Sequence, residues 1–70
     1  MGMKLSARNQ LSGTVAEIHL GDIVARVVVK IGDNVVESVI TRQSVEELAL
    51  KQGDAVRVVI KSTDVMIQKD

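Results

Sequence analysis

Apolar and polar residues alternate along most of this chain with the two-residue period of half-buried β-strands. From Ile23 to Ile31 one face carries only Ile, Ala and Val. We expect that face to be core. The other face carries Val24, Arg26, Val28 and Lys30 and is only half polar. Thirteen Val and six Ile in the whole chain support a mainly β fold, because β-branched side chains suit a pleated surface.

Turn residues separate the predicted strands. Gly13 to Leu20 reads as a first strand, closed by Gly21-Asp22. Gly32-Asp33-Asn34 supplies hairpin chemistry between the strand described above and a third strand over Val35 to Thr41. The first half of the chain therefore predicts three antiparallel strands.

One segment departs from the β pattern. Ser44 to Leu50 is predicted to be a short helix, with Ser44 as its N-cap and Glu47 at the third helical position, the arrangement of a capping box. Gly53 suits the left-handed position that follows a helix.

The last third of the chain predicts two more strands. Val56, Val58 and Ile60 face inward in the first of them, and a tight turn at Ser62-Thr63-Asp64 leads into Val65-Met66-Ile67. The predicted order is β-β-β-α-β-β. It indicates an all-β fold, a five-stranded OB-fold-like barrel with one short helix between strands 3 and 4. Closing the barrel would pair the edges of these apolar strands, which would otherwise be open to pairing with other chains.

Composition indicates how so small a fold is stabilised. The 70 residues, read as one domain over 1–70, contain no Cys, one His and no Phe, Tyr or Trp. A chain of this size buries a marginal core, and disulfides or a structural zinc site are excluded. We therefore expect a homo-oligomer, and exposed apolar residues at Val24, Val28 and Val59 fit that expectation.

Charge excludes several classes of partner. Nine basic residues balance nine acidic residues, so no long-range field attracts nucleic acid or an anionic membrane. No apolar run approaches the length of a membrane span, and no signal peptide is recognisable. We expect a cytoplasmic protein. Any anion site must come from a local group of residues, because the net charge is zero.

Two short polar clusters stand out from the aliphatic background. One is Ser6-Ala7-Arg8-Asn9-Gln10-Leu11 and the other is Ile60-Lys61-Ser62-Thr63-Asp64-Val65. The planar fork of Arg8 suits two oxygens of a tetrahedral anion, and Lys61 supplies a compact second charge. Hydroxyls, amides and the backbone N–H groups of a turn can satisfy the remaining lone pairs. Together the clusters predict an oxyanion site.

Both clusters, their separation and the SxxEL segment between them resemble the molbindin family of small molybdate-binding domains, also described as Mop or TOBE-like domains. The resemblance spans nearly the whole chain. It implies that Ser6, Arg8 and Asn9 line one side of a molybdate or tungstate site, and that Lys61, Ser62 and the adjacent Thr63 line the other.

The resemblance also implies an assembly. In the family a threonine and a serine before the helix, here Thr41 and Ser44, come from a neighbouring subunit. Stand-alone members form homohexamers, trimers of dimers, with the oxyanion bound between subunits for molybdenum storage or homeostasis. Molybdenum would be bound only as the oxyanion, with no catalytic cofactor.

Other interpretations of these residues stay open. Arg8 and Lys61 could be solvated surface charges, Thr41 the end of a strand and Ser44 a helix cap. His19 has no second His or carboxylate cluster beside it, which favours a strand-surface residue over a metal ligand. No nucleophile–base pair or paired carboxylates occur, so we expect no enzyme. The alternatives to oxyanion binding are an OB-fold nucleic-acid-binding domain, which would need aromatic residues and positive charge, and a purely structural interaction module.

Overall fold

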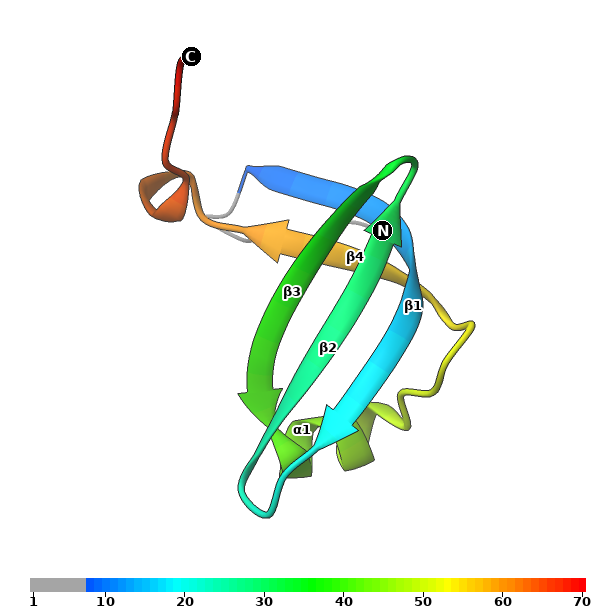
Figure 1. Ribbon diagram of the computed structural model, residues 1–70. Helices are drawn as coiled ribbons and strands as arrows, with labels where there is room; N and C mark the ends of the chain where they lie inside the picture. The colour runs from blue at the N-terminus through cyan, green and yellow to red at the C-terminus, as the bar shows by residue number, and fades with distance from the viewer. Residues whose placement is uncertain (1–7) are drawn as a thin grey trace.

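The computed structural model describes residues 8–70 as one curved antiparallel sheet with a short helix (Figure 1). The elements in chain order are β1 (Asn9–Leu20), β2 (Val24–Ile31), β3 (Asn34–Thr41), α1 (Arg42–Leu48), β4 (Ala55–Ile60) and a 3-10 turn, η1 (Ser62–Asp64). The mainly β fold and the helix between the third and fourth strands are confirmed.

Strand β1 links two parts of the sheet, whose order is β3-β2-β1-β4. Its first half, Asn9 to Thr14, pairs with β4, and its second half, Thr14 to Leu20, pairs with β2. The strand bends at a β-bulge between Val15 and Glu17. Gly13 lies where β1 changes its pairing partner from β4 to β2. A Cβ added there would come within 2.7 Å of the Lys30 carbonyl oxygen.

The β2–β3 hairpin forms at Gly32-Asp33 as the sequence predicts, with Gly32 at φ +60°. Two burial predictions along β2 are wrong. Ile23 is 78% exposed because the strand begins after it. Val28 is only 7% exposed on the outer face, where it lies on the central strand between Glu17 and Glu37 of the two neighbouring strands. Long side chains on both sides shield such a position.

Helix α1 begins earlier than predicted, and its caps differ from the prediction. Thr41, not Ser44, is the N-cap: its Oγ1 accepts a hydrogen bond from the Ser44 N–H at 3.0 Å. The left-handed residue after the helix is Ala49, at φ 51°, and not Gly53. Gly53 has φ +94° in the turn before β4, where its N–H donates to the Val15 carbonyl.

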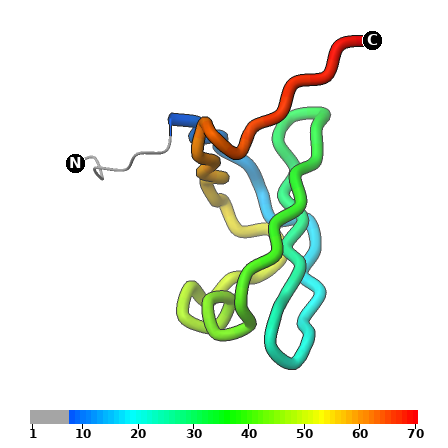
Figure 2. Tube along the Cα trace, turned by 90° about the vertical axis from the view of Figure 1, so that its left-hand side faces the viewer, coloured from blue at the N-terminus to red at the C-terminus, as the bar shows by residue number. Residues whose placement is uncertain are grey.

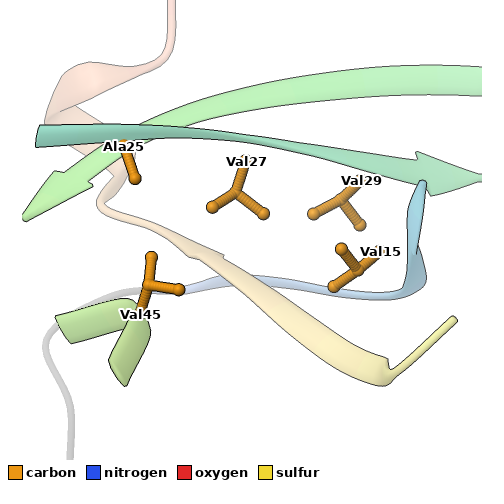
Figure 3. Packing of buried hydrophobic residues seen from close by; sticks show 5 residues of the cluster. All are labelled: Val15, Ala25, Val27, Val29 and Val45. Atoms are coloured by element: carbon orange, nitrogen blue, oxygen red, sulfur yellow. The ribbon is translucent and has the colours of Figure 1, made fainter. Parts of the chain in front are cut away.

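The buried core is small and entirely aliphatic. Ala25, Val27 and Val29 on β2 lie towards Val15 on β1 and Val45 on α1 (Figure 3). No residue of this cluster is larger than Val, and the larger aliphatic residues packed against it, such as Ile40 and Leu50, are only partly buried. Folding of a single chain therefore leaves much apolar surface exposed.

The predicted fifth strand is absent from the described residues, and the sheet is open. Val65 to Ile67 has no strand pairing, and β3 and β4 do not pair with each other. A three-residue apolar segment needs a partner edge to form a strand, and η1 directs this segment away from its own sheet (Figure 1). In residues 8–70 no helix is long and apolar enough to cross a membrane.

Candidate functional site

The described part of the first polar cluster, residues 8–11, lies beside the second cluster at one end of the sheet, where β1 begins and β4 ends (Figure 1). Asn9 and Ile60 are register partners, and Nδ2 of Asn9 donates to the Ile60 carbonyl oxygen at 3.3 Å. Arg8 directly precedes Asn9, and Lys61 directly follows Ile60. Segments more than fifty positions apart in the sequence therefore meet, as the oxyanion prediction requires.

A tight turn carries the donors of the second cluster. In η1 the Asp64 N–H donates to the Lys61 carbonyl at 2.9 Å and the Val65 N–H to the Ser62 carbonyl at 3.4 Å. The first N–H groups of such a turn have no partner within it. Within residues 8–70 the N–H groups and hydroxyls of Ser62 and Thr63 form no hydrogen bond, which leaves them available beside Lys61.

The two cations at this end have no carboxylate partner among the described residues, which is also true of Lys30 and Arg57. Arg26 pairs with Glu37 at 3.0 Å and Arg42 with Glu46 at 3.3 Å. Among the described residues, Arg8 and Lys61 form no ion pair and are exposed. The carboxylate of Asp64 is the acidic group in the same turn. Two cations with unpaired donors make this end suitable for an anion.

Thr41 and Ser44 lie at the opposite end of the sheet. Thr41 pairs with Val24, next to the turn that joins β1 to β2, and Asn9 is at the far end of β1. Within one chain, the structure does not bring these hydroxyls to the Arg8–Lys61 end. They could complete that site only from a second subunit.

The two hydroxyls form a local hydrogen-bond pair. Oγ1 of Thr41 donates to Oγ of Ser44 at 2.8 Å and accepts from the Ser44 N–H. One of the two hydroxyl protons is therefore used between these side chains, and the other remains free to be donated outward.

Sequence reasoning missed parts of this arrangement. The link between Asn9 and the Ile60 carbonyl depends on strand register, which the sequence did not specify. Thr41 as helix cap was also missed, although Thr is itself a favoured N-cap residue. Ser6, predicted as a ligand, lies outside the described residues.

His19 lies on the surface of a strand, as the sequence predicts. His19 is exposed on β1, where Nε2 lies 2.7 Å from Oε1 of Glu17. Within residues 8–70, no group of three or more His, Cys, Asp or Glu side chains is placed to hold a metal ion.

Comparison with known proteins decides the family. The model of the TOBE domain matches residues 5–67, which include both polar clusters and the helix. Molybdenum-pterin-binding protein 1 of Clostridium pasteurianum is 53% identical over 66 residues, covering 93% of this chain and 97% of the relative. The chain belongs to the molbindin family of TOBE domains.

Solved structures agree with this assignment. A molybdate-binding protein from Sporomusa ovata superposes with a TM-score of 0.92 at 37% identity, covering 96% of this molbindin and 100% of the other chain. The cytoplasmic molybdate-binding protein ModG, in a form with molybdate bound, gives a TM-score of 0.81 at 40% identity over 87% of this chain and 44% of ModG. The molbindin fold assignment thus rests on sequence and structure together.

Proposed function

We propose that this protein binds molybdate or tungstate at sites between subunits, for intracellular molybdenum storage or homeostasis. The observation that carries the proposal is the pairing of Asn9 with Ile60, which brings Arg8 and Lys61 to the same end of the sheet. A tetrahedral dianion needs two charges and several fixed donors when it leaves water. The two clusters supply both.

The ligand set is proposed as follows. Arg8 would hold two anion oxygens with its guanidinium fork, and Lys61 would approach a third. Hydroxyl, amide and turn N–H donors would complete the shell, from Ser6, Asn9, Ser62 and Thr63 of one subunit and from Thr41 and Ser44 of another. Because Oγ1 of Thr41 is held by the Ser44 N–H as the cap of α1, we assign the direct contact to the Ser44 hydroxyl and a positioning role to Thr41.

The assembly is part of the proposal. The separation of Thr41 and Ser44 from Asn9 along the sheet supports a site between subunits. We infer a homohexamer built as a trimer of dimers, in which each OB-like barrel gains its fifth strand and closes. The small aliphatic core and exposed apolar residues such as Val39 and Leu48 support further burial on assembly.

The same reasoning gives the cellular role. We infer a cytoplasmic binding protein without catalytic activity, in keeping with the names of its relatives, one of which is described as cytoplasmic and molybdate-binding. Molybdate or tungstate would be cargo and not a catalytic cofactor.

Calorimetric titration of the purified protein with sodium molybdate tests the proposal. We expect saturable binding with a defined stoichiometry, and molybdenum in protein isolated from molybdate-supplemented cells when it is measured by mass spectrometry. Arg8→Ala should weaken binding strongly, whereas Arg57→Ala, which removes a cation from the middle of β4, serves as the matched control and should not. Absence of molybdate binding by the wild-type protein would reject the proposal.

A further inference from the structure

Helix α1 is tied to the turn between β1 and β2 by its first residue, Arg42. The Arg42 backbone N–H donates to the Ile23 carbonyl at 2.8 Å, and Nη1 of its side chain donates to the Gly21 carbonyl at 3.2 Å. The start of α1 and this turn lie at the same end of the sheet in both views (Figures 1 and 2). Arg42 therefore joins the helix to a turn 21 residues earlier in the chain.

The turn that receives these contacts is itself constrained. The Gly21 N–H donates to the Val24 carbonyl at 2.8 Å. A Cβ added at Gly21 would lie 2.8 Å from that same carbonyl oxygen, so a larger residue would force the turn to shift. Val24 is also the register partner of Thr41, the N-cap of α1. The Gly21 carbonyl is therefore a fixed acceptor beside the start of the helix.

The contact with Gly21 distinguishes Arg42 from its neighbour on the helix. Nε of Arg42 lies 3.3 Å from Oε2 of Glu46, but this i,i+4 ion pair is exposed, and such pairs contribute little to stability. Gln43 makes a similar i,i+4 contact with Glu47 at 3.4 Å. Among the described residues, the Gln43 side chain forms no hydrogen bond to another element. Gln43 is thus a matched control for Arg42.

The helix has few other contacts that could fix its orientation. It is seven residues long, and Val45 is its one buried residue. Helices this short are marginal on their own and depend on contacts with the rest of the protein. Ser44, the second residue after Arg42, lies in the first turn of this helix, where its N–H donates to Oγ1 of Thr41 at 3.0 Å. The direction of the Ser44 hydroxyl therefore depends on how the start of α1 is held.

We propose that Arg42 is a positioning residue of the oxyanion site. By holding the start of α1 against the β1–β2 turn, it fixes the direction in which Ser44 presents its hydroxyl to the anion at the neighbouring subunit. This role rests on the proposed function, in which Ser44 contacts the anion. Arg42 itself makes no contact with the anion and acts only through Ser44.

Amide hydrogen exchange tests the structural step without molybdate. In Arg42→Ala the Ser44 N–H should exchange several-fold faster than in the wild type, because the first turn of the helix opens more often. Gln43→Ala should leave this rate unchanged. So should Glu46→Gln, which removes the ion pair and keeps the contact with Gly21. Equal exchange of the Ser44 N–H in Arg42→Ala and the wild type would overturn the proposal.

Calorimetry with molybdate tests the effect on the site. Arg42→Ala should weaken binding about two- to tenfold, the effect expected from losing one hydrogen bond. Gln43→Ala should bind as the wild type does. If Ser44→Ala weakens binding and Arg42→Ala does not, the role of Arg42 is rejected and the proposed function stands. If Ser44→Ala binds molybdate as tightly as the wild type, the proposed ligand set is wrong, and the role of Arg42 is rejected with it.

The double variant separates positioning from direct contact. In a chain that already carries Ser44→Ala, adding Arg42→Ala should cause no further loss of affinity, because residues that act through one another are not additive. A further loss as large as that caused by Arg42→Ala alone would mean that Arg42 acts independently of Ser44. That result would overturn the positioning role.

Discussion

Asn9 holds the start of β1 to the end of β4 through one side-chain hydrogen bond, from its Nδ2 to the Ile60 carbonyl oxygen at 3.3 Å. Ile60 is the last residue before Lys61, so this bond fixes the peptide from which the second polar cluster begins. Asn9 can therefore position the site even where it does not touch the anion.

Replacing Asn9 by Ala should weaken molybdate binding several-fold while the protein stays folded. A single hydrogen bond of this kind contributes about 0.5–1.5 kcal/mol. Gln10→Ala is the control, since Gln10 accepts a hydrogen bond from Arg57 on the other face. Calorimetry with molybdate measures both variants. An affinity unchanged in Asn9→Ala would mean that strand pairing alone positions Lys61.

Gly13→Ala should destabilise the protein by roughly 1–3 kcal/mol, because overpacking forces the backbone to shift. An added Cβ would lie 2.7 Å from the Lys30 carbonyl oxygen and 2.8 Å from side-chain atoms of Val29 and Ile31. Ser12→Ala, at the preceding exposed position, should change stability little. Urea denaturation compares the two. Equal urea midpoints for the two variants would show that the close approach of β1 to β2 at Gly13 does not require glycine.

Ala49→Gly should stabilise the protein by about 1 kcal/mol. Ala49 has φ 51° and ψ 42° after α1, a left-handed conformation that costs an L-residue roughly 1–2 kcal/mol and costs Gly almost nothing. Ala55→Gly, at an exposed strand position, should have the opposite effect. If thermal unfolding showed both variants to be less stable, the left-handed cap would not be a source of strain.

Phosphate should compete poorly with molybdate. The proposed groups can all turn donors towards the ligand, and molybdate, tungstate and sulfate carry no proton at neutral pH. Phosphate keeps at least one proton throughout the neutral range, and that proton would face donors and remain unsatisfied at a cost of roughly 1–3 kcal/mol. Tungstate should bind about as well as molybdate, and the smaller sulfate should bind less well.

Competition titrations at pH 7 and pH 8 check this selectivity. Phosphate should displace molybdate weakly at both values and somewhat better at pH 8, where less of it carries a second proton. Equal displacement at both values would show that the site contains an acceptor, for which the Asp64 carboxylate is the candidate.

Local chemistry explains which parts of the fold could be predicted from the sequence. Alternation and turn residues identified β2, β3 and the Gly32-Asp33 hairpin, because these depend on neighbours along the chain. The helix caps were misplaced because both Thr41 and Ser44 are good capping residues, and the choice depends on where β3 ends. The burial of Val28 depends on flanking strands and could not be read from its own strand.

The candidate site was predictable in composition but not in geometry. Arg8 and Lys61 stood out as cations among donors, yet their proximity follows from the register of β1 on β4. The fifth strand was predicted from the apolar residues Val65 to Ile67, but a strand needs an edge to pair with. Within residues 8–70 of one chain, this segment does not pair with the free edges of β3 or β4. Both features depend on long-range pairing, which residue patterns do not encode directly.

Subunit complementation tests the central claim, that one subunit supplies the cations and another supplies the Ser44 hydroxyl. One variant carries Arg8→Ala and Lys61→Ala, and the other carries Ser44→Ala. Each alone should bind molybdate much more weakly, since losing one partner of a desolvated charged contact costs on the order of 2–5 kcal/mol. In oligomers assembled from both, an intact cation end would meet an intact Ser44 in a fraction of the sites. Calorimetry of the mixed oligomers should then recover wild-type affinity at reduced stoichiometry. Mixed oligomers that bind no better than their two parents would contradict a site shared between subunits.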